Sequence, residues 1–198
     1  TVRIAEVNNE MAKFKTAITQ FKVEFGIEPP SSLTIWETAA DWATHPRDRR
    51  IVKQLWPQFD FSIDREFDGD ATTDSGYQTE SFPVDGAECL VFFLGGMADG
   101  TTGALRGFSS NARNPFVVDN GARVGPFFEF NGGFDVSGSA PTPIGRLVDT
   151  DSDGLPEYLD TLPGQALPYV YFSSYGGEGY RIGDNPGRMA APYFKDAL

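Results

Sequence analysis

The sequence predicts an α+β fold on three observations. One amphipathic helical stripe runs through the first 25 residues, short aromatic or β-branched runs fill the second half, and 22 glycines and 14 prolines are spread over 198 residues. So many glycines and prolines impose turns, which argues against a helical bundle. A hydrophobic content of 40% is enough for one core, so we expect a single domain over 1–198.

The clearest predicted helix covers residues 1–26. Charged and amide side chains, Glu10 among them, take the outer faces, and Gly26 with Pro29-Pro30 ends the helix. The apolar stripe has alternating steps of three and four, as one helix face requires: Ile4, Val7, Met11, Phe14, Ile18, Phe21 and Phe25. Because the stripe is already running at Thr1 without a capping box, we expect the natural helix to extend further toward the N-terminus.

Three more helices and a β-rich second half are predicted from local signals. The helices are expected in SSLTIWETAADWA (31–43, capped by Ser31 or Ser32), PRDRRIVKQLW (46–56) and DGAECLVFFLGGM (85–97). Strands are expected in GPFFEF (125–130), IGRLVD (144–149), LPYVYFSSY (167–175) and GYRIG (179–183), with a loop at NGGFDVSGSAPTP (131–143).

The net charge of −12 limits the classes of partner that this chain can bind. Nucleic-acid phosphates and anionic lipid surfaces are repelled unless a basic patch is present. The densest basic run, RDRR at 47–50, is interpreted as a solvated helix face. Bound divalent cations or an extracytoplasmic surface suit this composition better, and we expect no nucleic-acid partner.

The stretch DTDSDGLPEYLD (149–160) has the spacing of an oxygen-rich calcium loop. Its six candidate ligand positions are Asp149, Asp151, Asp153, Leu155 (through its carbonyl), Glu157 and Asp160, and Gly154 provides the sharp bend. The alternative is a solvated acidic turn. Asp160 replaces the usual bidentate Glu, Pro156 removes an N–H, and the preceding residues predict a strand, so we expect an unpaired, structural Ca²⁺ site on a β scaffold.

The sequence has no recognisable catalytic constellation. His45 is the only histidine, Cys89 is the only cysteine and lies in an apolar run, and there is no GxSxG, GxGxxG or phosphate-binding loop. We therefore expect that the protein is not an enzyme. A carboxylate-based hydrolase stays open as a third interpretation, because acidic residues are plentiful.

Two stretches resemble a known family. NNEMAKFKTAITQFKVEFGIEPPS (8–31) resembles the exposed half of the stalk helix in type IV pilin-like proteins, most of all the major pseudopilin of type II secretion. Phe21, Gly26 and Pro29 match the aromatic, Gly and Pro of the family's segment that ends this helix. In DTLPGQALPYVYFSS (160–174), four residues match the family's Asp-x-x-Gly-x-Pro-Tyr run with extra spacing: Asp160, Gly164, Pro168 and Tyr169.

The resemblance covers residues 4–35 and 147–175 and implies a pilin-like fold, with the long helix packed on an antiparallel sheet. It divides the chain into a stalk helix (1–26), inserted helices and loops with the first strands (31–145), and the calcium loop with C-terminal strands (146–198). The middle, roughly 57–145, is much longer than in compact members.

The function that the resemblance implies is structural. Such a subunit self-associates through its N-terminal helix, contacts other pilin-like subunits, and is anchored in the inner membrane by a preceding apolar segment before assembly, so its place is the periplasm or the cell surface. The alternative is an extracytoplasmic, calcium-stabilised binding module for carbohydrate or protein. A cleavage motif and an apolar helix of ~20 residues directly before Thr1 would favour the pilin interpretation.

Overall fold

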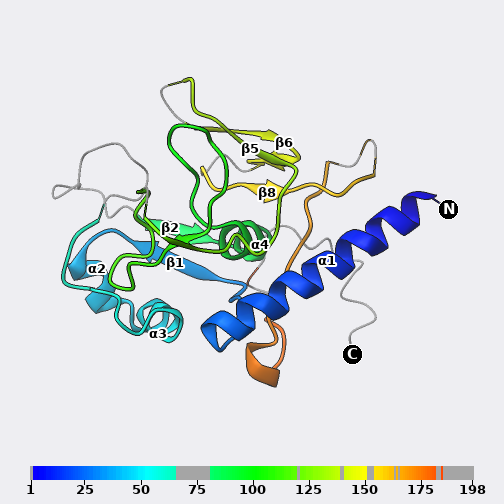
Figure 1. The fold of residues 1–198 in the computed structure, drawn as a ribbon. Helices are drawn as coiled ribbons and strands as arrows, with labels where there is room; N and C mark the ends of the chain where they lie inside the picture. Colours follow the sequence, from blue (N-terminus) through cyan, green and yellow to red (C-terminus); the bar gives the residue numbers. More distant parts are fainter. Residues whose placement is uncertain are drawn as a thin grey trace.

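The computed structural model has an α+β architecture in which one long helix lies against shorter helices and small antiparallel sheets (Figure 1). It describes residues 2–65, 81–119, 121–138, 141–150, 154–162, 164, 166–181 and 184. Within that part of the chain, no helix is both long and apolar enough to cross a membrane.

The helices are α1 (Val2–Phe25), α2 (Ala39–Thr44), α3 (Pro46–Leu55) and α4 (Gly86–Gly95), with a 3-10 turn η1 (Tyr175–Gly177). The strands are β1 (Leu33–Trp36), β2 (Ser81–Val84), β3 (Phe108–Ser109), β4 (Arg123–Val124), β5 (Gly132–Asp135), β6 (Thr142–Gly145), β7 (Leu147–Val148) and β8 (Glu157–Tyr158). They pair in sequence order, antiparallel, as four two-stranded sheets. Among the described residues there is no single larger sheet of the kind expected against the long helix.

Helix α1 confirms the predicted amphipathic helix, but only part of its stripe is buried. Phe14 and Phe21 lie in the core, whereas Ile4 is 66% exposed and Met11 40%. Figure 1 shows the N-terminal part of α1 extending beyond the sheets and the other helices. The buried part of the stripe therefore lies in the C-terminal half of α1, and the exposed part lies in its N-terminal half.

The most deeply buried element is α4, against which α1 packs. All ten residues of α4 are buried, as its apolar sequence predicts. Its N-terminus is closed by a capping box in which Asp85 accepts from the backbone of Glu88 and the Glu88 carboxylate accepts from the Asp85 N–H at 2.7 Å. Phe93 meets Phe21 of α1 edge to face, with ring centroids 5.7 Å apart. This contact joins α1 to the buried helix α4.

The prediction of a helix over 31–43 was wrong for its first half. Leu33 and Ile35 are buried and alternate with less buried neighbours, a period of two that fits β1, which pairs with β2. The helix begins only at α2, where the Thr38 hydroxyl accepts from the Asp41 N–H at 3.1 Å. The helices predicted over 46–56 and 85–97 are confirmed as α3 and α4.

The strand predictions in the second half were only partly right. The expected loop at 131–143 contains β5 and the start of β6, which form a hairpin, and the run at 144–149 is divided between β6 and β7. The run at 125–130 forms no strand, because the N–H groups of Phe127 and Phe128 donate instead to Leu94 O at the end of α4. At 167–175 the ladder is limited to the bridge between Leu159 and Pro168. The described residues 179–181 are not in a strand.

Candidate functional site

The acidic stretch 149–160 lies in a β-hairpin. Strand β7 precedes it, strand β8 lies within it, and their register pairs Leu147 with Tyr158 and Val148 with Glu157. A strand before the loop was expected, and a strand after it replaces the second helix of a helix-loop-helix site. The loop is thus built on a β scaffold, whose base is held by a very short ladder.

The described candidate ligands occupy distinct places at this hairpin. Asp149 accepts from the Gly154 N–H at 3.1 Å, which closes the loop, and Leu155 turns its side chain into the core. Glu157 is fully buried, and its carboxylate accepts from the Thr150 N–H at 2.9 Å and hydroxyl at 2.6 Å. The structure therefore brings Asp149 and Glu157 to the base of one hairpin.

Asp160, the last candidate ligand of the stretch, is not grouped with these two carboxylates. Asp160 accepts from the Leu162 N–H at 2.7 Å in a turn of its own. Asp151 and Asp153 lie outside the described residues. In the described part of the chain no three His, Cys, Asp or Glu side chains are grouped as a metal would need. Occupancy of the loop by Ca²⁺ stays a prediction.

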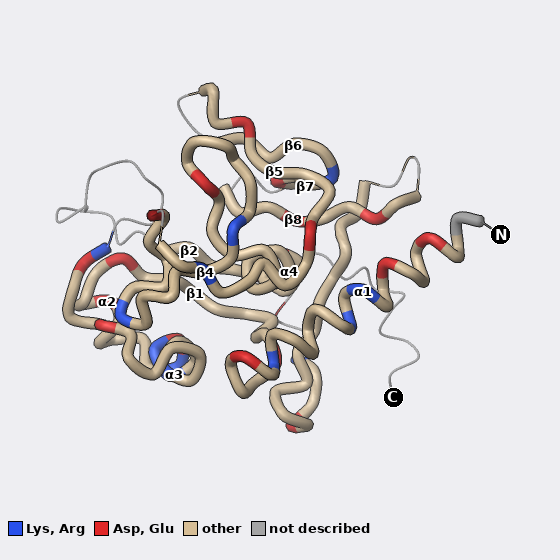
Figure 2. The backbone as a smooth tube through the Cα atoms, in the orientation of Figure 1, with Lys and Arg blue, Asp and Glu red and all other residues tan. Residues whose placement is uncertain are grey.

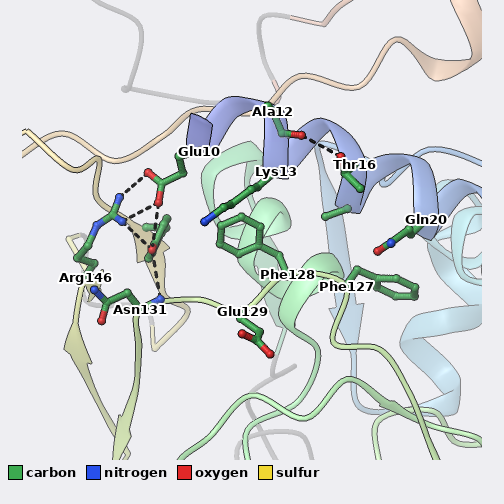
Figure 3. A pocket seen from close by; sticks show the side chains of 12 residues that line it. Glu10, Ala12, Lys13, Thr16, Gln20, Phe127, Phe128, Glu129, Asn131 and Arg146 are labelled. Carbon is green, nitrogen blue, oxygen red and sulfur yellow. Dashed lines mark hydrogen bonds and ion pairs between the residues drawn. The ribbon is translucent and has the colours of Figure 1, made fainter. Parts of the chain in front are cut away.

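The same hairpin is fixed to α1 by an ion pair that the sequence pattern does not indicate. The Glu10 carboxylate and the Arg146 guanidinium make two N–H···O hydrogen bonds of 2.7 Å each (Figure 3). Tyr169 donates its hydroxyl to Glu10 at 2.7 Å, and Arg146 donates to the Tyr158 hydroxyl at 2.8 Å. Arg146 also donates to Leu159 O, directly after β8. Residues on both sides of the acidic loop thus hold one carboxylate of α1.

The electrostatics of this cluster favour the charged pair. Burial raises the pKa of Glu10, but hydrogen bonds from Arg146 and Tyr169 and the Arg146 charge outweigh burial, so the pKa lies below its usual value. Burial and the bond to Glu10 raise the pKa of Tyr169. The Arg146 guanidinium also lies over the Tyr158 ring, 4.2 Å from its centroid. A carboxylate held ionised in this way is a poor general acid and a good structural anchor.

An open groove of about 670 Å³ lies beside the pair, between α1 and the segment 127–131 (Figure 3). Along α1 it is bordered by small and polar side chains such as Thr16 and Gln20, and opposite them by Phe127 and Phe128. Its lining thus combines polar and aromatic side chains.

A second set of contacts attaches the C-terminal segment to the turn after α1. Ser174 donates to the Glu28 carboxylate at 2.7 Å, and the Tyr171 hydroxyl donates to Pro29 O at 2.9 Å. Asp184 is buried and accepts from the Ser31 hydroxyl at 2.7 Å. The stretches 4–35 and 147–175 therefore contact each other.

His45 and Cys89, whose residue types are often used in catalysis, are both held in contacts with the rest of the fold. His45 stacks on Trp36 with ring centroids 3.7 Å apart, and its Nδ1 lies 2.8 Å from Asp41 O. Cys89 is buried, and burial raises the pKa of its thiol well above the usual value.

The importance of Glu10 could not be seen from its local sequence. The apolar stripe passes through Val7 and Met11, which assigned Glu10 to a solvated face, yet Glu10 is buried and Met11 is exposed. Only a signal that couples position 10 with position 146 would have identified the pair.

Comparison with known proteins adds no relative. No family model matches the sequence, and neither the curated proteins nor the solved structures contain a match to it.

Proposed function

We propose that this chain is the extracytoplasmic part of a structural subunit in a type II secretion pseudopilus or a type IV pilus-like filament. The observation that carries the proposal is the division of α1: Phe14 and Phe21 fix its C-terminal half to the body, whereas Ile4 and Met11 leave apolar surface exposed on its N-terminal half. Contact with neighbouring molecules that cover an exposed apolar stripe is favourable, because it removes apolar surface from water.

The contacts of the two family-like stretches support the same role. Glu10 and Glu28 are each held by a side chain of the segment 169–174, through Tyr169 and Ser174. Such cross-links make the stalk helix and the body one mechanical unit, as a filament subunit needs. In this proposal the fold is a pilin-like variant, in which a long helix packs on small sheets rather than on one sheet.

The proposed role needs no reaction at the site. Ca²⁺ in the loop 149–160 would offset the entropy lost in ordering the loop, and the hairpin would pass that order to Arg146 and Tyr158. Before assembly the subunit would be anchored in the inner membrane through an apolar segment ahead of α1, with the described domain in the periplasm or at the cell surface. Its partners would be further copies and other pilin-like subunits.

Filament formation by the full-length gene product tests the proposal. Cells that express the wild type should yield filaments in sheared fractions by negative-stain electron microscopy. Ile4→Asp should reduce their amount at least ~10-fold, because a charge in the contact costs several kcal/mol. Val23→Asp is the matched control, since Val23 is 81% exposed on a different face of α1. Filaments that are equally abundant with Ile4→Asp, or absent from the wild type under inducing conditions, would contradict the proposal.

The groove beside α1 favours a second candidate, a binding module for carbohydrate or protein. Thr16 lies in its wall, and Thr16→Arg would fill the groove without touching the Glu10–Arg146 pair. Binding to arrayed glycans or peptides that Thr16→Arg abolishes would favour this candidate. Filaments that persist with Thr16→Arg and disappear with Ile4→Asp would favour the first.

A further inference from the structure

Helix α3 concentrates positive charge on a chain whose net charge is −12. Four of its ten residues, Arg47, Arg49, Arg50 and Lys53, are basic and exposed. Its one acid, Asp48, is buried and accepts from Trp36 Nε1 at 3.3 Å and from Arg47 at 3.2 Å. Figure 2 shows basic positions along α3, while acidic positions are spread over the rest of the molecule.

Two hollows share a ridge on this helix, formed by Arg50 and Gln54. One, of about 370 Å³, lies between α3, the C-terminal end of α1 and the segment 173–181. The other, of about 380 Å³, follows α3 itself. We call the cations around both hollows the basic α3 face: Lys22, Arg47, Arg49, Arg50, Lys53 and Arg181.

Acids at this face compensate only part of its charge. Glu28 accepts from Lys22 at 3.2 Å and from Ser174, and Glu178 lies 4.0 Å from Arg181. Lys53 and Arg50 form no ion pair or hydrogen bond within the described residues. With six cations against Glu28, Glu178 and Asp48, the face is positive and the remainder of the chain is more acidic than the whole.

We propose that the basic α3 face docks an acidic surface of a second copy of this chain. The chain itself supplies the excess of carboxylates, and at a screening length of about 8 Å a local patch prevails over repulsion between the two net charges. The two surfaces that meet are different, so the contact is heterologous and leaves a free surface of each kind for a further subunit, as a filament needs. The inference rests on the proposed function, to which it adds an electrostatic contact separate from the exposed apolar stripe of α1.

Other polyanions fit the face less well. A nucleic acid that extends beyond it meets the acidic remainder of the molecule. A flat anionic membrane meets Glu178 at the rim, whose side chain is 78% exposed, and does not fill the two hollows. A second copy of this chain needs only a local match between its carboxylates and the cations of the basic α3 face.

Sedimentation velocity of the full-length protein at 50 and 500 mM NaCl tests the contact. We expect association at low salt that weakens about 10-fold or more at high salt, and a similar weakening at low salt by Arg50→Gln or Lys53→Gln. Lys15→Gln is the matched control, because it removes the same charge from an exposed position on α1 outside the face. Far-UV circular dichroism checks that all variants are folded.

A photo-crosslinker at position 54 then identifies the partner surface. Cross-linked dimers of purified protein whose second peptide is rich in Asp and Glu support the proposal. Association that neither high salt nor Lys53→Gln weakens would overturn the proposal. A protein that stays monomeric while a DNA oligonucleotide or phosphatidylglycerol vesicles bind the face would also overturn it. If Ile4→Asp abolishes the filaments and Lys53→Gln leaves them unchanged, the contact through the basic α3 face is ruled out and the proposed role of α1 is retained.

Discussion

Arg146 and Glu10 lie 136 residues apart in the sequence, and their side chains meet through two N–H···O hydrogen bonds of 2.7 Å each. Arg146 directly precedes β7, so the pair joins the hairpin of the acidic loop to α1. The bidentate geometry fixes orientation as well as distance. A change in the order of the hairpin therefore reaches α1 through this ion pair.

Removal of one partner of this pair should destabilise the fold strongly. Glu10→Met leaves the half-buried Arg146 guanidinium without its carboxylate partner, which costs about 2 kcal/mol in the free energy of unfolding measured with urea. The double variant Glu10→Met/Arg146→Met should lose less than the sum of the single variants. Lys22→Met, at the exposed pair with Glu28, should cost under about 1 kcal/mol. A loss equally small for Glu10→Met would show that the buried pair does not hold the fold.

The pair should also make stability depend on pH in the acid range. Because the pKa of Glu10 is lower in the folded state than the usual 4.5, its contribution is present above that value and is lost as pH falls through the folded pKa. The difference in unfolding free energy between wild type and Glu10→Gln should therefore shrink below about pH 4.5. Urea titrations of both proteins between pH 7 and pH 2 measure it, and a constant difference would contradict this account.

Calcium should raise the melting temperature of the domain. At a calcium concentration of about 100 times Kd the gain is about 2.7 kcal/mol, or roughly 5–10 °C for a domain of this size. Asp151→Ala and Asp153→Ala should abolish the difference between melts in Ca²⁺ and in chelator. Glu129→Gln, an exposed acid outside the loop, should leave it unchanged. Identical melting temperatures for all proteins in both conditions would leave an acidic turn as the interpretation.

Two glycines with positive φ should differ sharply in their response to alanine. Gly154 (φ +87°) has open space where a Cβ would lie, so Gly154→Ala should cost only the backbone term of about 1 kcal/mol. A Cβ on Gly96 (φ +77°) would lie 2.3 Å from the Gly107 backbone, so Gly96→Ala should cost about 3 kcal/mol or prevent folding. Equal costs in urea denaturation would mean that the close approach of Gly96 and Gly107 is not maintained.

The elements that could be predicted carry their own signals. Helix α1 has a periodic stripe, α3 lies between two prolines, and α4 combines an apolar run with a capping box at Asp85. Strand β1 was missed because the alternation of Leu33 and Ile35 spans only four residues and runs directly into the helical signal after Thr38. Its strand character comes from pairing with β2, which is distant in the sequence.

The candidate site shows the same division between local and long-range information. The spacing of Asp149, Gly154 and Glu157 predicted a loop, and the structure places it on a hairpin. The ring of groups around Glu10 could not be predicted, because Arg146, Tyr158 and Tyr169 reach it from the far end of the chain. Aromatic runs such as 125–130 were misassigned to strands because their rings fill the core, which gives the same composition.

The segment 169–174 reaches α1 through Tyr169 at Glu10 and reaches the turn just beyond the helix through Tyr171 and Ser174. These two levels are separated by about 20 Å of helix. A pull along the axis of α1 would therefore load both sets of contacts at once, in shear, instead of breaking them one after another. Under tension the domain should thus yield abruptly at a high force, without gradual peeling of the helix from its body.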